Sequence, residues 1–326
     1  MNKKAAWLVA LLFLAAGTLA QGQRPNKVPR IGFLSLGSVS SMASRVDAFQ
    51  RGLREHGYVE GQNIHIEYRY AEGDQNRLGA FAAELVNLKV DVIITGGTIA
   101  TRPAKQATNT IPIIMAYDSN PVESGVVASL ARPGGNITGL ASLSTELSGK
   151  RLELLQQAVP KLTRVEVFVN PSDPGAVTAV KELEPVAKGL GLSVYPFEIR
   201  NPEDIDKGFQ AAIKIRAGAL MAIGDPITFT HRKRVVDLAI RNHLPSIHGQ
   251  IQFIEAGALM VYGPNEADMY RRTANFVDKI LKGAKPGDLP VEQPKNFEFL
   301  INLKAAKQIG LTIPQSVLYR ADKVIK

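Results

Sequence analysis

The stretches Arg30-Ile31-Gly32-Phe33-Leu34 and Arg164-Val165-Glu166-Val167-Phe168 decide the fold, because each of them opens the same kind of unit. An apolar strand is followed by a turn of small or polar residues, by a helical spacing of apolar residues, and by a second strand. A unit that occurs twice predicts two α/β lobes of similar construction. Two such lobes leave a cleft between them that is suited to a ligand.

The two units match step by step. Turn, helical face and returning strand fall at 35–41, 46–53 and 64–69 in the first unit, and at 170–175, 177–190 and 192–197 in the second. Gly57 ends the first helix, because glycine readily adopts the positive φ of a helix C-terminus. Pro185 lies inside the second helical pattern. It predicts a kink or a break there, because proline removes a backbone donor.

The same alternation of strands and helices continues along the chain. Further apolar strands are predicted at 90–95, 111–116, 138–140, 219–223, 246–248, 258–262 and 297–301, most of them separated by helical patterns. Alternating β and α elements build parallel sheets through right-handed crossovers. The sequence therefore predicts an α/β fold with two doubly wound parallel sheets, one in each lobe.

The N-terminus has the pattern of an export signal. Residues 1–20 carry Lys3 and Lys4, then an apolar run at 5–16, then small residues that suit cleavage after Ala20. The apolar run is shorter than the roughly 20 residues that a membrane-spanning helix needs. We therefore expect a signal peptide at 1–20 and a mature protein without a membrane anchor. At 326 residues and 45% hydrophobic content, the chain is long enough for two packed cores.

The sequence contains no cysteine. This excludes disulfides, thiolate metal sites, cysteine nucleophiles and a lipid-modified cysteine after the signal, so a free periplasmic protein is expected. Loss of Lys3 and Lys4 with the signal lowers the formal charge from +9 to +7. The basic residues form only short runs, as at 232–234 and 271–272, without interleaved aromatic residues. This pattern is typical of solvated helix faces and does not favour a nucleic-acid site.

Candidate ligand-binding residues follow from the predicted sheets. In open parallel sheets a ligand binds beyond the carboxyl ends of the strands, where helix N-termini offer free N–H groups. Glycines there let a ligand approach the backbone, and carboxylates can receive an ammonium group. The candidates are Leu36, Gly37, Gly97, Thr98, Tyr117, Asp118, Asn120, Ser142, Asn170, Asp173, Asp225 and Tyr262. Each of them taken alone is also explained by turn chemistry or helix capping, so the hypothesis concerns the set.

No catalytic constellation accompanies these candidates. The nucleophile elbow Gly-x-Ser-x-Gly, the Walker phosphate loop and the dinucleotide fingerprint Gly-x-Gly-x-x-Gly are all absent from the sequence. The five histidines show no metal-ligand spacing such as His-x-x-x-His. The sequence thus predicts a binding cleft without catalytic residues, metal ligands or a cofactor.

Three longer stretches carry a family resemblance. They are Gly57-Tyr58-Val59-Glu60-Gly61-Gln62-Asn63-Ile64 with Glu67-Tyr68-Arg69, then Leu130-Ala131-Arg132-Pro133-Gly134-Gly135-Asn136-Ile137-Thr138-Gly139, and Tyr270 through Pro290 with Lys279-Ile280-Leu281-Lys282-Gly283. On these motifs the chain from 28 to 325 resembles the ABC transporter substrate-binding protein family that includes tryptophan- and tyrosine-binding members. That family is similar to type I periplasmic binding proteins, in which three crossings join two lobes that close on a small solute.

The resemblance implies how the chain divides into lobes. The crossings would lie near 138–142, 261–264 and 289–294. The N-terminal lobe would comprise 28–139 plus 264–289, and the C-terminal lobe would comprise 142–261 plus 294–326. The helix between the last two crossings would pack on the first lobe.

The resemblance also implies a function. A monomeric carrier would capture a small solute in the periplasm by hinge closure and deliver it to an ABC permease in the inner membrane. The solute could be an aromatic or another amino acid. Its carboxylate would bind the N–H groups around Gly97-Thr98 and its ammonium group would bind Asp118 or Asp225, with Tyr117 and Tyr262 as partners of an aromatic ring.

Other functions remain to be compared with this one. A periplasmic sensor partner that presents its ligand to a receptor kinase is expected to have the same sequence features. An enzyme on a two-lobed α/β scaffold is disfavoured by the missing motifs. An effector-binding regulator with this fold would carry a helix-turn-helix ahead of it, where this chain has an export signal.

Overall fold

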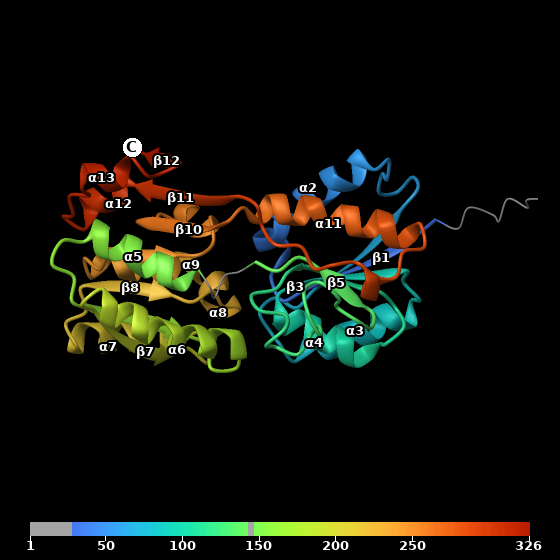
Figure 1. Cartoon of the computed structure of the whole chain (residues 1–326), viewed down its shortest axis with the longest axis horizontal. Helices are drawn as coiled ribbons and strands as arrows, with labels where there is room; N and C mark the ends of the chain where they lie inside the picture. The colour runs from blue at the N-terminus through green and yellow to red at the C-terminus, as the bar shows by residue number, and fades with distance from the viewer. Residues whose placement is uncertain (1–27, 143–146) are drawn as a thin grey trace, which may run out of the picture.

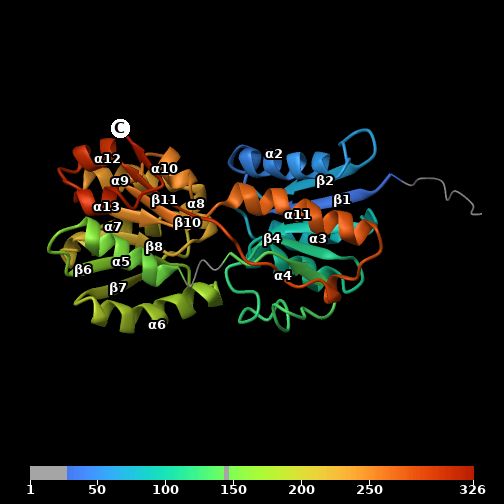
Figure 2. The ribbon, with the colours of Figure 1, turned by 45° about the horizontal axis from the view of Figure 1, so that its top comes forward.

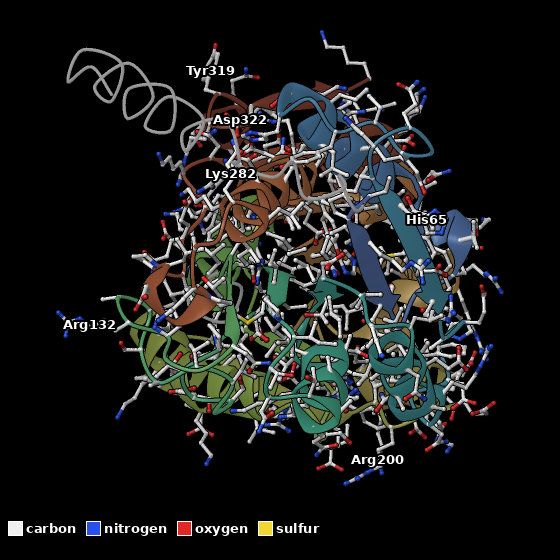
Figure 3. The ribbon with its side chains drawn as sticks, turned by 90° about the vertical axis from the view of Figure 1, so that its right-hand side faces the viewer. His65, Arg132, Arg200, Lys282, Tyr319 and Asp322 are labelled. Carbon is white, nitrogen blue, oxygen red and sulfur yellow. The ribbon has the colours of Figure 1, made fainter. Side chains whose placement is uncertain are left out.

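The computed structural model describes residues 28–142 and 147–326, which form two α/β lobes side by side (Figure 1). The predicted signal peptide at 1–20 lies outside the described residues. Within the described ranges, every helix is too short or too polar to cross a membrane. Charged side chains such as Arg132, Arg200 and Lys282 point outward on different parts of the surface (Figure 3).

The first lobe is built on a five-stranded sheet in the order β2-β1-β3-β4-β5, in which all neighbouring strands are parallel. The strands are β1 (Arg30–Ser35), β2 (His65–Tyr70), β3 (Val92–Gly96), β4 (Ile113–Tyr117) and β5 (Ile137–Gly139), and the helices are α2 (Val39–Glu55), α3 (Arg77–Asn87), α4 (Thr98–Ala107) and α11 (Glu266–Leu281). Successive side chains of a strand point to opposite faces. Phe33 therefore packs with α2 and α11 on one face, while Leu34 packs with α3 and α4 on the other.

The second lobe is built on a seven-stranded sheet in the order β12-β11-β10-β9-β8-β6-β7. Its strands are β6 (Arg164–Val169), β7 (Ser193–Glu198), β8 (Ala219–Ala222), β9 (Ser246–His248), β10 (Met260–Pro264), β11 (Phe297–Asn302) and β12 (Lys323–Ile325). The order β7-β6-β8-β9-β10 repeats the strand order of the first lobe, which confirms the predicted duplication. Two strands at one edge, β11 and β12, run opposite to the others, because β11 is antiparallel to β10 and β12 is parallel to β11.

Helices cover both faces of the second sheet (Figure 2). One face carries α5 (Ser148–Ala158), α6 (Pro174–Gly189), α12 (Leu303–Gln308) and α13 (Gln315–Leu318), and the other carries α7 (Asp204–Lys214), α8 (Pro226–Thr230), α9 (Arg232–Arg241) and α10 (Gln252–Glu255). Of the kink or break predicted at Pro185, the break was wrong, since α6 runs without interruption through this residue. Ala179, Leu183 and Ala187 lie on both sides of Pro185 and are buried against the sheet. Their burial outweighs the lost backbone hydrogen bond.

Three connections join the lobes, and their described parts lie beside one another. The chain leaves the first sheet after β5, returns from β10 into α11, and passes from the 3-10 helix η1 (Pro286–Asp288) into β11. Ala141 N donates to Glu292 O at 2.9 Å, and the Thr138 hydroxyl donates to Leu289 O at 2.7 Å. These bonds tie the first connection to the third, while the β10–β11 ladder ties the second to the third. The predicted residue limits of the two lobes stay a prediction.

Close packing holds α11 on the first lobe. A Cβ atom added at Gly52 of α2 would lie 2.1 Å from the backbone oxygen of Arg271 in α11. Only glycine therefore allows the two helices to approach this closely. The approach matters for the cleft, because the first turn of α11 contributes Glu266 to it.

Candidate ligand-binding site between the lobes

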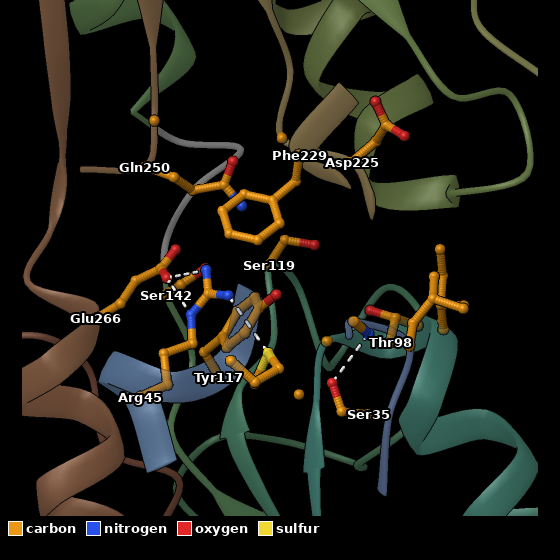
Figure 4. A pocket seen from close by; sticks show the side chains of 18 of the residues that line it. Ser35, Arg45, Thr98, Tyr117, Ser119, Ser142, Asp225, Phe229, Gln250 and Glu266 are labelled. Carbon is orange, nitrogen blue, oxygen red and sulfur yellow. Dashed lines mark hydrogen bonds and ion pairs between the residues drawn. The ribbon is translucent and has the colours of Figure 1, made fainter. Parts of the chain in front are cut away.

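A cleft lies where the carboxyl ends of the two sheets face each other (Figure 4). The loops after β1, β3 and β4 line it from the first lobe, and the loops after β6, β8 and β9 line it from the second. About 900 Å³ between these walls is free of protein atoms, part of it open to solvent. This is the edge at which doubly wound sheets bind their ligands.

Most of the residues predicted from sequence line this cleft. They are Leu36, Gly37, Gly97, Thr98, Tyr117, Ser142, Asp173 and Asp225. All but Ser142 follow or end a parallel strand, or begin the helix after it. They lie together because the carboxyl ends of equivalent strands in both sheets point toward the cleft, and ligands of open parallel sheets bind beyond these ends. Ser142 reaches it from the first connection between the lobes.

Asp118 lies behind the cleft wall. The Thr98 hydroxyl donates to its carboxylate, at 2.8 and 2.9 Å from the two oxygens, and Asn120 N donates to it at 3.1 Å. Burial raises the pKa of the Asp118 carboxyl to about 7. Asp118 therefore fixes the position of Thr98, and the cleft lining does not include it.

Asn120, Asn170 and Tyr262 also lie outside the lining. The Asn120 side chain accepts from Glu123 N at 3.2 Å, and the Asn170 side chain accepts from Ser172 N at 2.9 Å, so both amides shape turns. The Tyr262 ring stacks on Phe297 in the neighbouring strand, with ring centres 6.3 Å apart. These contacts correspond to the turn and packing roles that each residue could have on its own.

A helix N-terminus forms one wall of the cleft. An α-helix leaves the first N–H groups without intrahelical partners, and α4 begins at Thr98 with no side-chain cap. Gly97 precedes it at φ 79°, a conformation that favours glycine, and Gly97 N donates to Tyr117 O at 2.9 Å. Thr98 and Ile99 both line the cleft. This wall can bind a negatively charged group.

Two aspartates that cap helices line the cleft from the second lobe, Asp173 and Asp225. Asp225 caps α8 by accepting from Ile227 N at 2.6 Å and from the Thr228 hydroxyl at 2.6 Å. Asp173 caps α6 by accepting from Gly175 N at 2.9 Å. Burial raises the pKa of Asp225 to about 6 and also raises the pKa of Asp173. Both carboxylates can therefore gain from a positively charged group placed in the cleft.

The sequence prediction missed a buried ion pair in the cleft. Arg45 of α2 donates to Glu266 Oε2 through Nε at 2.7 Å and also through Nη2. The two residues are 2% and 4% exposed. Figure 4 shows the guanidinium group between Glu266 and the Phe229 ring of the other lobe.

Aromatic rings from two helices and one strand also line the cleft. Phe229, Tyr117 and Tyr270 lie in α8, β4 and α11, and they were not recognised as a group in the sequence. Met42 and Gln250 also belong to the lining and were not among the predicted residues. One feature of the sequence could have identified Arg45 as a buried residue with a partner. Arg45 shares a buried stripe with Met42 and Phe49, at helical spacing, and an arginine on an apolar stripe needs a partner.

Comparison with known proteins places the chain in a family. The sequence profile described as ABC transporter substrate binding protein matches residues 30–325. The tyrosine-binding protein of Clostridioides difficile is 28% identical over 287 residues, which cover 88% of this chain and 82% of that protein.

Two solved structures extend this comparison. The ABC domain from Streptococcus pneumonia in complex with L-Trp has a TM-score of 0.84 and 27% identity, covering 92% of this chain and 100% of that chain. A substrate-binding protein with adhesive properties from Clostridium difficile, in its ligand-free, open structure, has a TM-score of 0.67 and 26% identity, covering 92% and 99%. Because the family profile spans nearly all of the described residues, this chain belongs to the ABC transporter substrate-binding protein family.

Proposed function

We propose that this protein is the solute-binding component of an ABC uptake transporter, and that it captures an aromatic amino acid in the cleft. The observation that carries the proposal is the opposition of charge across the cleft. The uncapped N-terminus of α4 lines it from the first lobe, and the acidic residues Asp173 and Asp225 line it from the second. A zwitterion has both complementary charges.

The polar groups assign an orientation to the ligand. Its carboxylate would accept from the backbone at Thr98, and its ammonium group would donate to Asp225. The sequence offered Asp118 as an alternative to Asp225 for binding the ammonium group of the ligand. Asp118 lies outside the cleft lining and Asp225 belongs to it, which favours Asp225.

The rest of the lining supports an aromatic side chain. Phe229, Tyr117 and Tyr270 offer ring surface, and Met42 adds a polarizable thioether. The relatives point to the same class of ligand. One is a tyrosine-binding protein and another was solved in complex with L-Trp.

Hinge closure is part of the proposal. The structure is nearer in shape to the L-Trp complex than to the ligand-free, open structure, at nearly equal sequence identity. This difference supports a change in lobe arrangement between the two states. A ligand that contacts both walls stabilises the closed state by its differential affinity for it.

The ligand class is tested by dialysis of residues 21–326 against an equimolar mixture of the standard amino acids. Retained amino acids are released by denaturation and identified by mass. We expect one aromatic amino acid per protein, and less of it with Asp225→Asn. Asp237→Asn is the matched control, because Asp237 pairs with Lys233 on an exposed helix and should not affect retention. Retention of no aromatic amino acid would contradict the proposal.

The cellular part of the proposal concerns export and delivery. We expect the signal at 1–20 to be removed and the mature, monomeric protein to deliver its ligand from the periplasm to a permease. The mature protein in a periplasmic fraction should begin at Gln21. An intact Met1 terminus in a cytoplasmic fraction would contradict this location.

A further inference from the structure

Two hydroxyl groups in the cleft lining are buried without a hydrogen-bond partner in the part of the chain that the structure describes. They are Tyr270 Oη and Ser142 Oγ, in residues that are 0% and 3% exposed. A buried polar group without a partner is costly, and native proteins contain few of them. Two in one ligand cleft indicate that the ligand supplies the partners.

The Tyr270 hydroxyl lies at the ligand-binding edge of the first sheet. A Cβ atom added at Gly96, the last residue of β3, would lie 2.4 Å from Tyr270 Oη. The absence of a side chain at Gly96 therefore makes room for this hydroxyl. Burial raises the pKa of Tyr270 well above its usual value, so the hydroxyl keeps its proton and can donate.

The Ser142 hydroxyl lies near the Arg45–Glu266 ion pair, with which the Tyr270 hydroxyl also interacts electrostatically. Ser142 N donates to Asp118 O at 2.7 Å, which fixes the backbone of the first connection at this point. In Figure 4 Ser142 lies beside Arg45 and Glu266, on the opposite side of the view from Thr98 and Asp225. The proposed binding site for the ligand's main-chain groups is therefore separated from Ser142 by the aromatic part of the lining.

We propose that the hydroxyls of Ser142 and Tyr270 bind a polar atom on the ligand's side chain, so that the cleft selects aromatic rings with a hydrogen-bonding atom over a plain phenyl ring. This inference rests on the proposed function. A phenol can donate and accept, and an indole N–H can donate to either hydroxyl. Phenylalanine leaves both hydroxyls without a partner. The selected class comprises tyrosine and tryptophan.

The experiment compares the affinities of residues 21–326 for tyrosine, tryptophan and phenylalanine by calorimetry. We expect tyrosine or tryptophan to bind at least about tenfold more tightly than phenylalanine, because the phenyl ring leaves buried hydroxyls unpaired. In Tyr270→Phe and Ser142→Ala the affinity for the preferred ligand should fall about three- to tenfold, while the affinity for phenylalanine should not change. The preference should therefore decrease in both variants.

Two controls separate a contact with ligand from a structural role. Ser124→Ala removes another buried hydroxyl without a partner, which lies outside the cleft lining, and should not change any of the three affinities. Tyr270→Phe removes an unsatisfied group, so the melting temperature without ligand should be unchanged or higher. A lower melting temperature would assign the hydroxyl a structural role and contradict the inference.

The outcomes also separate this inference from the proposed function. If phenylalanine binds as tightly as tyrosine and tryptophan, or if both variants keep the original preference, the inference is wrong although the protein binds aromatic amino acids. If none of the three binds, the proposed ligand class is wrong, and the inference is overturned with it.

Discussion

The guanidinium carbon of Arg45 lies 4.3 Å from the centre of the Phe229 ring, and the two residues belong to different lobes. Arg45 is held in place by Glu266, at the start of the helix that follows the second connection. The cation–π contact exists only while the lobes are this close together, whereas the ion pair lies within the first lobe. Phe229 therefore contributes to the lobe arrangement seen in this structure.

Phe229→Leu is expected to weaken ligand binding at least about tenfold. Leucine keeps an apolar side chain beside Phe253 but removes the ring face, and a desolvated cation–π contact contributes about 2 kcal/mol. Loss of the contact lowers the population of the closed state. Calorimetry measures the affinity, and small-angle scattering measures closure on addition of ligand.

The matched control is Phe81→Leu. Phe81 forms the same kind of contact with Arg77, at 4.8 Å, but both residues lie in α3 of the first lobe. This variant should leave affinity and closure unchanged. An equal loss of affinity in both variants would show that the contact across the cleft has no special role.

Glu266→Gln is expected to destabilise the protein by about 3–5 kcal/mol, because it leaves the buried Arg45 charge without a counter-charge. Urea unfolding measures the change. Asp206→Asn breaks the exposed pair with Arg234 and should cost less than about 1 kcal/mol. Equal effects of the two substitutions would contradict the burial argument.

A double variant separates stability from binding at this pair. Arg45→Met with Glu266→Met replaces both charges by apolar side chains, which is often neutral for stability. The free energy of unfolding should return toward that of the unmodified protein. The affinity for ligand should stay reduced, because the contact with Phe229 is lost. Recovery of both properties would contradict the role of Arg45 in closure.

Gly52→Ala should destabilise the first lobe by about 1–3 kcal/mol or more, since its Cβ would overlap the backbone of α11. Gly79→Ala is the control. Gly79 lies in helix α3 with no atom within 4 Å of its added Cβ, so alanine should stabilise this helix by up to about 1 kcal/mol. Chemical denaturation of the two variants tests the opposite signs. A stabilising Gly52→Ala would refute the close packing of the two helices.

Ligand affinity should fall as the pH is lowered through about 6. Burial raises the pKa of Asp225 to about 6, so below this pH the ammonium group of the ligand must displace a proton. The affinity should fall by up to about tenfold per pH unit below 6 and level off above it. Titrations from pH 5 to pH 8 measure this slope, which Asp225→Asn should abolish. An affinity independent of pH in the unmodified protein would exclude Asp225 as the ammonium acceptor.

Protonation of Asp225 at low pH weakens ligand binding but stabilises the folded protein. Because its pKa in the folded protein is higher than in the unfolded chain, the folded state binds more protons between pH 4 and pH 6. The contribution of Asp225 to the free energy of unfolding is therefore largest at low pH and decreases as the pH rises through this window. Asp225→Asn should remove this part of the pH dependence.

The fold could be predicted because its determinants are local. Strands such as Ile31–Leu34 and Val165–Phe168 are mostly apolar, turn residues follow them, and the pattern repeats, so two parallel sheets follow from general rules. The expectation that ligands bind beyond the carboxyl ends of parallel strands then identified Gly97, Thr98 and Asp225, which the structure brings to one cleft.

The remaining site residues depend on contacts that local patterns do not contain. Arg45 and Glu266 are 221 positions apart, and they meet only because α11 returns to the first lobe. Phe229 reaches the cleft through the approach of the second lobe. Conversely, Asp118 and Tyr262 had the right residue type near a strand end, but their side chains are occupied behind the wall or within the sheet.

The most direct test of amino acid capture is a calorimetric titration of residues 21–326 with tryptophan. Trp7 is the only tryptophan and precedes this segment, so ligand fluorescence can be followed in parallel without background from the protein. We predict saturable one-to-one binding without turnover. A micromolar dissociation constant would correspond to about 8 kcal/mol. The absence of saturable binding for tryptophan, and likewise for tyrosine, would contradict the account.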